Sequence, residues 1–229
     1  MTTPSSRPLQ PGEPAPSFVL PAVNRDGSVA LEDYRGKKPV LIGLFRGLHC
    51  PFCRRQVARL GFTRDKLADE GVETLAIVNT QAERARQYFQ YRPTRVLLAA
   101  DPDVRTHQAF GLPKIGFLPD DTSPGELKWP QRTTMAIFRA VRVNPEGLLP
   151  EPLDPLSANE ALNKQEGFVL TPADQEIIAA HVTQLTGIFL IDRDATIRWA
   201  YIEAPDRPDE LLNFPSDDEI VAAARTLSG

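Results

Sequence analysis

The 229-residue sequence predicts an α/β fold with a central mixed sheet flanked by helices. Strand-like and helix-like segments alternate between residues 40 and 110, which is typical of a parallel sheet with right-handed crossovers. Two further apolar segments, 187–191 and 196–202, are joined by a short polar turn and predict an antiparallel hairpin. The length favours a single domain, residues 1–229, with a large core.

The chain begins with a polar, proline-rich stretch, residues 1–12, which we expect to be a flexible arm. This stretch has no apolar h-region, so we expect no signal peptide. The segments 12–21 and 28–31 flank a tight turn at 24–27. They predict a small hairpin ahead of the core.

Residues 40–45 form a continuous apolar run, which predicts a strand buried on both faces of the sheet. After Cys50 the pattern changes, because Val57 and Leu60 follow Cys53 at helical spacing. Pro51 agrees with a helix start, since proline is tolerated in the first turn. We therefore expect a helix from about Cys50 to residue 70.

The next elements continue the alternation. We expect a strand at 72–78, a helix at 81–91 capped by Thr80, a strand at 97–100 and a helix at 104–110. A further helix is predicted at 171–182, where Thr171 and Pro172 read as N-cap and first helical residue. The last helix is expected at 216–227, with Ser216 and Glu219 as a capping box.

The periodicity fades between residues 112 and 166, where eight prolines interrupt it. Residues 135–143 are compatible with either a strand or a helix. Irregular connections of this length are unusual inside a compact domain and are commonly lids or partner surfaces. We expect an ordered proline-rich insertion, 112–166, that packs near the cysteines; surface decoration explains the composition equally well.

The two cysteines of the chain, Cys50 and Cys53, lie at the start of the predicted helix. The positive end of the helix dipole and the unpaired N–H groups favour a thiolate, so we expect a lowered pKa for Cys50. Cys53 lies one turn later and can attack a mixed disulfide or sulfenic acid formed on Cys50. Arg46 and Arg54, together with Arg55, add positive charge.

The cysteine pair has two other interpretations. A structural zinc site needs two more ligands, and the histidines, at 49, 107 and 181, have no ligand-like spacing. Two unreactive core cysteines are the other alternative. A Cys-x-x-Cys that follows a strand and opens a helix is more specific for redox chemistry. We expect neither a metal nor a cofactor.

Composition restricts the partners and the compartment. The formal net charge of -4 argues against nucleic acid. No run of 18 apolar residues is present, so we expect no membrane span. A cytoplasmic location is expected, and there a lone cysteine pair is more often redox-active than a structural disulfide.

Four stretches resemble the peroxiredoxin-like branch of the alkyl hydroperoxide reductase / thiol-specific antioxidant (AhpC/TSA) family in the thioredoxin superfamily. They are residues 12–20, 45–54, 101–111 and 187–194, and the second, Phe-Arg-Gly-Leu-His-Cys-Pro-Phe-Cys-Arg, is the specific one. The resemblance implies a thioredoxin-like fold. It also implies an antioxidant thiol-disulfide oxidoreductase that reduces peroxides or disulfides, with electrons from a small thiol or a thioredoxin-like partner. Homodimers are common in this group.

By resemblance, Cys50 is the attacking sulfur and Cys53 the resolving one. Typical peroxiredoxins carry Pro seven residues and Thr or Ser three residues before the attacking cysteine, where this chain has Gly43 and Gly47. Thioredoxins carry a cis-proline before the hairpin strand. Thr186 occupies the corresponding region, and we expect its hydroxyl to face the sulfurs.

Three basic residues are candidates for supporting the chemistry. Arg46 or Arg54 would stabilise the oxyanion that leaves the peroxide. An arginine near a helix is also commonly a solvated surface charge. His49 would lower the pKa of Cys50 as a neighbouring cation, or only cap the loop.

Two functional hypotheses follow. The first is an enzyme that cycles between the dithiol and the Cys50–Cys53 disulfide, either as a peroxidase or as a thioredoxin-like disulfide reductase without peroxidase activity. The second is a non-enzymatic redox sensor that uses the same disulfide as a switch, with the insertion as the responding surface.

Overall fold

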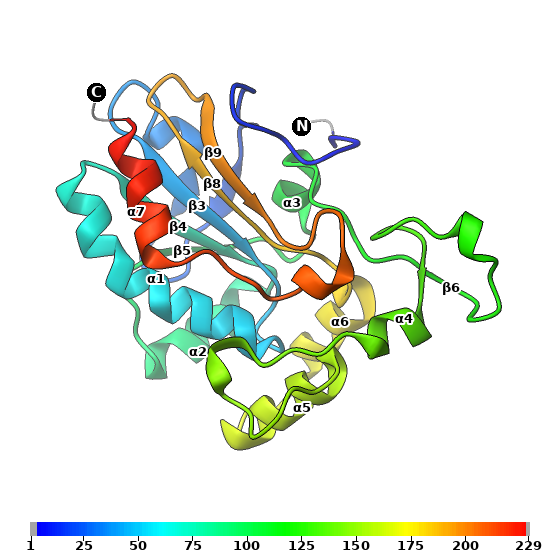
Figure 1. Ribbon diagram of the computed structural model, residues 1–229. Coiled ribbons are helices and arrows are strands. Elements are labelled where there is room, and N and C mark those ends of the chain that lie inside the picture. The colour runs from blue at the N-terminus through cyan, green and yellow to red at the C-terminus, as the bar shows by residue number, and fades with distance from the viewer. Residues whose placement is uncertain (1–3, 228–229) are drawn as a thin grey trace.

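The computed structural model describes residues 4–227 and contains a five-stranded mixed sheet with the order β5-β4-β3-β8-β9 (Figure 1). β3 pairs in parallel with β4, and β4 pairs in parallel with β5. β8 pairs antiparallel with both of its neighbours, β3 and β9. The strands are β3 Val40–Phe45, β4 Glu73–Val78, β5 Leu97–Ala100, β8 Gly187–Ile191 and β9 Ile197–Ile202. The predicted α/β fold with its mixed sheet is confirmed.

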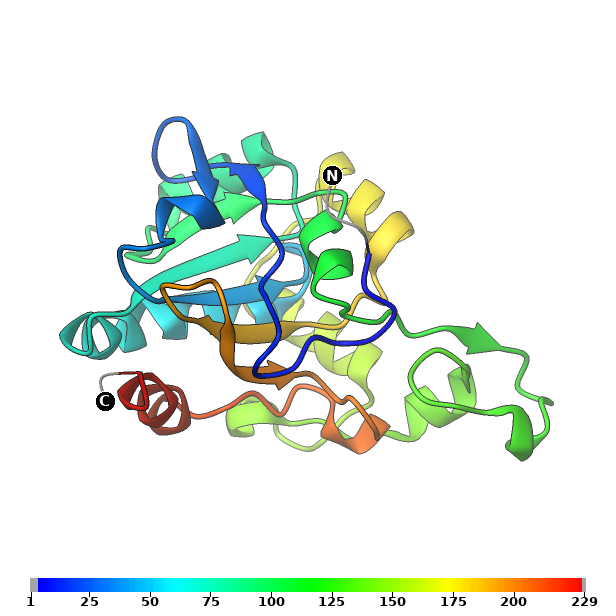
Figure 2. The same ribbon diagram turned by 90° about the horizontal axis from the view of Figure 1, so that it is seen from above.

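Each face of the sheet carries its own apolar core. Leu41 and Phe45 of β3 belong to the cluster shared with helices α1 (Pro51–Asp69), α2 (Ala82–Tyr91) and α7 (Asp217–Arg225). Ile42 and Leu44 belong to the opposite cluster. That face is covered by the hairpin of β1 (Val19–Pro21) and β2 (Ser28–Ala30) and by the residues that follow α3 (Arg105–Ala109), as Figure 2 shows. Alternate residues of the strand thus point to opposite faces, as the pleat requires.

The helix ends follow the local capping signals with one exception. Capping boxes are present at Thr171 with Asp174, before α6 (Pro172–His181), and at Ser216 with Glu219, before α7. The prediction that Thr80 caps α2 is wrong, because the N-cap is the next residue and makes no side-chain cap. The Thr80 hydroxyl instead accepts the Leu48 N–H at 3.2 Å, where it holds the loop that precedes the cysteines.

The proline-rich insertion is built from short elements beside the carboxyl end of β3 (Figures 1 and 2). It contains β6 Phe117–Leu118, β7 Thr133–Thr134, α4 Met135–Ala140 and α5 Pro155–Gln165, so residues 135–140 are helical rather than extended. Asp154 caps α5 by accepting the N–H groups of Leu156 and Ser157. Single 3-10 turns complete the chain at Leu31–Asp33, Pro124–Glu126, Pro145–Gly147 and Pro208–Glu210.

The N-terminal residues 4–12 lie along the body of the protein. The N–H groups of Ser5 and Leu9 donate to the carbonyls of Gln108 and Phe110 at 3.0 and 3.1 Å, and the Gly12 N–H donates to the Ile197 carbonyl at 2.8 Å. The expectation of a flexible arm is therefore wrong for residues 4–12, because backbone hydrogen bonds fix them; residues 1–3 lie outside the described part. None of the helices within residues 4–227 is long and apolar enough to cross a membrane.

Candidate redox site

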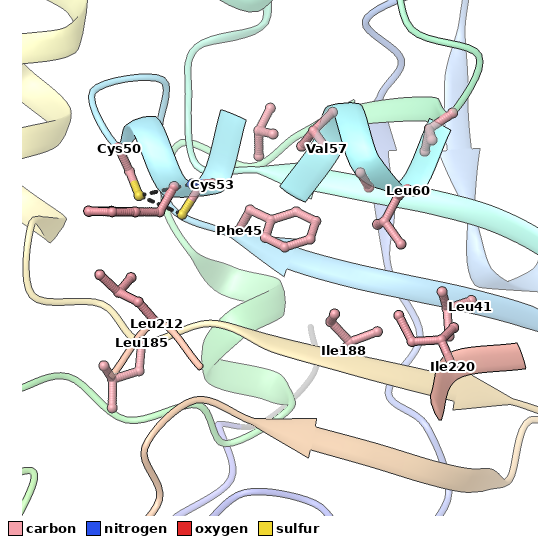
Figure 3. Close-up of a cluster of buried hydrophobic side chains, with 14 of the residues drawn as sticks. Leu41, Phe45, Cys50, Cys53, Val57, Leu60, Leu185, Ile188, Leu212 and Ile220 are labelled. Carbon is pink, nitrogen blue, oxygen red and sulfur yellow. Dashed lines mark hydrogen bonds between the residues drawn. The ribbon is translucent and has the colours of Figure 1, made fainter. Parts of the chain in front are cut away.

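The two cysteines occupy the first turn of α1, at the end of the sheet where β3 stops. Cys50 is the N-cap residue, and its Sγ accepts the Cys53 N–H at 3.2 Å. The two Sγ atoms lie 2.7 Å apart as free thiols, and each residue is 2 % exposed. Figure 3 shows both side chains directed toward the same side, above Leu212. The pair is thus positioned for disulfide formation.

The environment of Cys50 favours its thiolate. Burial raises the pKa of Cys50, but the hydrogen bond from the Cys53 thiol, the charge of Arg46 and the Cys53 N–H together lower it to about 6. Burial and the neighbouring Cys50 sulfur raise the pKa of Cys53 well above its ordinary value. Near pH 7, Cys50 is the anion and Cys53 is the thiol that donates to it. This asymmetry is the one that an attacking and a resolving cysteine require.

Arg46 follows β3 directly and forms a buried, bidentate ion pair with Glu203 at the end of β9. The Nη1–Oε2 and Nη2–Oε1 distances are both 2.9 Å, and Nη1 also donates to the Gln184 carbonyl at 3.1 Å. The Glu203 side chain is fully buried and Arg46 is 11 % exposed. Glu203 further accepts the N–H groups of Thr186 and Leu212 at 3.0 and 3.3 Å. Because two hydrogen bonds join Arg46 to Glu203, the plane of the guanidinium group is fixed. Its positive charge is therefore held near the cysteines.

Thr186 contributes to this network from a different position than we predicted. Its hydroxyl donates to Glu203 Oε2 at 3.0 Å, not to a sulfur. A buried carboxylate is a stronger acceptor than a thiol, which explains the orientation of the hydroxyl. Thr186 therefore reaches the redox site only through Glu203 and Arg46. Glu203 could not be singled out from the sequence, since a single acidic residue after a strand carries no local signal.

Arg54 points away from the cavity beside Cys50 and into the insertion. It donates to the Leu48 carbonyl, to Asn163 Oδ1 at 2.8 Å and to Glu166 Oε2 at 2.5 Å. Its Cζ lies 4.1 Å from the centroid of the Phe168 ring. The side chain is only 4 % exposed, so the interpretation as a solvated surface charge is wrong. Arg54 joins the first turn of α1 to the insertion.

His49 and Arg55 contact different parts of the protein from Arg46. His49 is buried, and burial together with the charge of Arg46 lowers its pKa to about 4, so the ring is neutral near pH 7. It therefore cannot lower the pKa of Cys50 as a cation. Its carbonyl accepts the Asn163 Nδ2–H at 2.9 Å. Arg55 binds Glu166, with an Nε–Oε1 distance of 2.9 Å.

The two glycines before Cys50 are places where a side chain would collide with its surroundings. A Cβ on Gly43 would lie 2.4 Å from the Phe45 ring, and one on Gly47 would lie 2.5 Å from the Asn79 carbonyl oxygen. Position 47 is the one where the family that the sequence resembles usually carries a hydroxyl side chain. The close approach of the β4 end to this loop requires glycine there.

A cavity of about 310 Å³ opens onto Cys50. Arg46, His49 and Cys50 line it, whereas Cys53 and Arg54 do not. Most of the remaining lining is apolar and comes from the insertion, from α6 and from Leu211 and Leu212. Cys50 is thus reached through a largely apolar cavity, which the sequence did not indicate.

Two of the three histidines considered for a zinc site, His107 and His181, do not line the cavity at Cys50. His107 is fully buried, and burial lowers its pKa to about 4. His181 lies at the end of α6 beside Lys114, whose Nζ is 2.9 Å from His181 Nδ1. Within residues 4–227, no group of three or more His, Cys, Asp or Glu side chains is arranged to hold a metal ion.

The chain is similar to known proteins in its sequence and in its fold. The AhpC/TSA family profile matches residues 11–143, more than half of the chain. No curated protein matches the sequence.

Three solved structures have a similar fold. The peroxidoxin BcpB of Mycobacterium tuberculosis has a TM-score of 0.55 at 12% identity, covering 96% of this chain and 98% of that one. The reduced 2-Cys peroxiredoxin of Plasmodium vivax has a TM-score of 0.56 at 16% identity, with coverage of 95% and 81%. Peroxiredoxin Q of Xanthomonas campestris has a TM-score of 0.52 at 10% identity, with coverage of 93% and 92%. At such identities the likeness establishes the fold alone.

Proposed function

Because this chain belongs to the AhpC/TSA family, we propose that it is a thiol-dependent oxidoreductase that reduces peroxides or disulfides through Cys50 and Cys53. The enzyme cycles between the dithiol and the Cys50–Cys53 disulfide. We place it in the cytoplasm, where small thiols are kept reduced. A small thiol or a thioredoxin-like protein returns the two electrons.

One observation carries this proposal: the Sγ of Cys50, at the N-cap of α1, lies 2.7 Å from the Sγ of Cys53, and the Cys53 thiol and Arg46 lower the pKa of Cys50 to about 6. The thiolate is the nucleophile in exchange with disulfides and in attack on peroxides. A neighbouring thiol with a high pKa stays protonated until it is needed for resolution. No metal or organic cofactor is needed for either reaction.

In the peroxide reaction, the Cys50 thiolate attacks one oxygen of the O–O bond and becomes a sulfenic acid. The other oxygen leaves as an oxyanion, which the Arg46 guanidinium stabilises from its fixed position. Cys53 then attacks the sulfenic acid, forms the disulfide and releases water. In the disulfide reaction, Cys50 forms a mixed disulfide, which Cys53 resolves in the same way.

The proposal is tested by following both thiols during peroxide addition. Wild-type protein should lose two titratable thiols for each hydroperoxide consumed, and a thiol-coupled assay should show turnover. Cys50→Ser should abolish consumption, whereas Cys53→Ser should accumulate a sulfenic acid that dimedone traps. Reduction of insulin disulfides without peroxide turnover would leave only the disulfide reductase. Loss of neither thiol with either oxidant would contradict the proposal.

A second candidate, a non-enzymatic redox switch, is favoured by the contacts of Arg54. This residue directly follows Cys53 and binds Asn163, Glu166 and Phe168 of the insertion region. Closing the disulfide would displace the first turn of α1, and Arg54 would transmit that displacement. Limited proteolysis of reduced and oxidised protein tests the switch. An identical cleavage pattern at residues 112–166 in both states would exclude it.

A further inference from the structure

A second cavity, the polar pocket, lies between α1, the insertion and the segment that follows β9. Its volume is about 320 Å³, and its polar lining includes Gln56, Arg59, Arg142, Glu146, Asp209 and Asn213. Neither cysteine lines this pocket. Among residues 4–227, it shares only Leu211 and Leu212 with the cavity at Cys50. The polar pocket is therefore separate from the redox site, and the proposed redox reactions do not use it.

Gln56 is a buried polar residue of this pocket. It lies on α1 one turn after Cys53 and is only 8 % exposed. Its side-chain amide makes no hydrogen bond to any other group within residues 4–227. Buried polar side chains are almost always hydrogen-bonded, because burial removes their bonds to water. Since Gln56 lines the polar pocket, its amide group is available to a molecule that enters there.

The backbone around the pocket includes two residues in an uncommon conformation. Leu212 and Glu146 both line the pocket, and their φ angles are 64° and 61°. Residues other than glycine rarely adopt this left-handed region, and a leucine there is an outlier. Such conformations persist only where the surrounding structure holds them, and they are concentrated at functional and ligand-binding sites. These two residues therefore support a binding role for the pocket.

Arg142 provides a positive group that no carboxylate neutralises within residues 4–227. Its Nη1 donates to the carbonyls of Arg139 and Val141 at 2.7 and 3.0 Å. The other N–H groups of this guanidinium make no hydrogen bond in that part of the chain. A guanidinium binds a carboxylate through two parallel hydrogen bonds. Together with the Gln56 amide, Arg142 therefore fits the carboxylate of a ligand.

The pocket also carries negative charge. Asp209 lies 3.9 Å from Arg207 and its side chain is 69% exposed, so this ion pair is weak. Arg59 is bound by Asp217 at 2.7 Å and lies 3.7 Å from Glu146. The two arginines and two carboxylates of the lining have formal charges that cancel. A ligand with one charge of each sign is therefore more complementary to the pocket than an anion or a cation.

We propose that the polar pocket binds a small zwitterionic peptide, with its carboxylate at Arg142 and Gln56 and its ammonium group at Asp209. An apolar cavity of about 150 Å³ accommodates benzene, so a volume of about 320 Å³ holds roughly a dozen non-hydrogen atoms, the size of a dipeptide. Phe214 lines the pocket and provides apolar contact for a side chain of the peptide. This inference assigns a binding site in addition to the proposed redox function and does not depend on that function.

Two substitutions remove the groups assigned to the carboxylate. Gln56→Leu replaces the amide with an apolar side chain of similar size and breaks no hydrogen bond within residues 4–227, so the thermal midpoint should not fall. Arg142→Met removes an exposed guanidinium. Its matched control is Arg139→Met, because Arg139 is exposed on α4 three residues earlier and does not line the pocket.

The first measurement is a calorimetric titration of the reduced protein with L-alanyl-L-alanine. Wild-type and Arg139→Met protein should bind this dipeptide saturably at one site. Gln56→Leu and Arg142→Met should each weaken binding by about tenfold or more, since each removes a hydrogen bond to a charged group. N-acetyl-L-alanyl-L-alanine amide lacks both charges and should not bind. Absence of saturable binding by wild-type protein, equal binding of the blocked peptide, or unchanged affinity in either variant would overturn the proposal.

Free L-alanine distinguishes a peptide site from an amino-acid site. It carries the same two charges but fills only about half of the pocket, so it should bind more weakly than the dipeptide. Equal or tighter binding of L-alanine would overturn the assignment to a peptide.

The second measurement locates the bound dipeptide. Because neither cysteine lines the polar pocket, saturating L-alanyl-L-alanine should leave the rate of Cys50 alkylation by iodoacetamide unchanged. Protection of Cys50 would place the dipeptide in the cavity at Cys50 and overturn the assignment to the polar pocket. Neither measurement requires turnover of a peroxide or a disulfide, so a failure of the proposed redox function would not alter the result.

Discussion

Two arginines flank Cys50 at equal distances in the sequence, and their surroundings differ completely. Arg46 lies four residues before Cys50 and Arg54 lies four residues after it. Arg46 lines the cavity and is held by Glu203 from the sheet, whereas Arg54 turns to Glu166 and Asn163 in the insertion. The electrostatic role of an arginine is therefore determined by the partner of its guanidinium group. Its proximity to Cys50 in the sequence does not determine that role.

The largest effect should follow from removing Arg46 together with its partner. In Arg46→Met/Glu203→Gln, no unpaired carboxylate is left buried, which separates electrostatics from misfolding. The charge and the hydrogen bond of Arg46 are lost, whereas the hydrogen bond from the Cys53 thiol remains, so the pKa of Cys50 should rise from about 6 toward the free-thiol value of about 8.5. Alkylation of Cys50 by iodoacetamide at pH 7 should therefore slow by about threefold or more.

The matched variant on the other side is Arg54→Met. It leaves Arg46 in place, so the pH midpoint of Cys50 alkylation should stay near 6. The contacts to Asn163 and Glu166 are lost, and amide hydrogen exchange in α5 should accelerate by about tenfold. Arg55→Met, which removes a 31%-exposed partner of Glu166, should have a smaller effect. A large rise in the pKa of Cys50 in Arg54→Met would erase the distinction between the two arginines.

The smallest expected effect distinguishes Glu203 from Glu166, the carboxylate partners of the two arginines. Glu203→Gln leaves the charge of Arg46 uncompensated, so the pKa of Cys50 should fall further below about 6, and alkylation at pH 5 should quicken by about threefold. Glu166→Gln removes a carboxylate from the Arg54 side and should leave the alkylation profile unchanged. An increase in the pKa of Cys50 in Glu203→Gln would mean that Glu203 acts by holding Arg46 in place, more than by its charge.

The sheet beside Arg46 and the insertion beside Arg54 also differ in how much of their structure could be predicted from the sequence. The sheet and α1 could be predicted because residues 40–45 form an unbroken apolar run and Pro51 marks a helix start. α5 was missed, although Asp154 and Pro155 repeat the cap-and-proline signal that was used at Thr171 and Pro172. The density of prolines in the insertion concealed it.

Only the features of the site that depend on residues close together in the sequence could be predicted. The lowered pKa of Cys50 follows from the Cys53 thiol, the charge of Arg46 and the Cys53 N–H at the N-cap, and these residues all lie within the Cys-x-x-Cys motif and the four residues before it. The role of Glu203 depends on its pairing with Arg46, 157 positions away, and the orientation of Thr186 depends on a hydrogen bond to Glu203, 17 positions away. The cavity likewise arises from segments that meet only in the folded chain. Neither feature has a periodic or local signature in the sequence.

The glycine at position 47 limits which side chains the loop before Cys50 can carry. A Cβ there would lie 2.5 Å from the Asn79 carbonyl oxygen, so serine or threonine at this position would require the loop and the end of β4 to separate. A hydroxyl side chain at position 47 is therefore expected to be tolerated only together with further substitutions that move the loop or the end of β4.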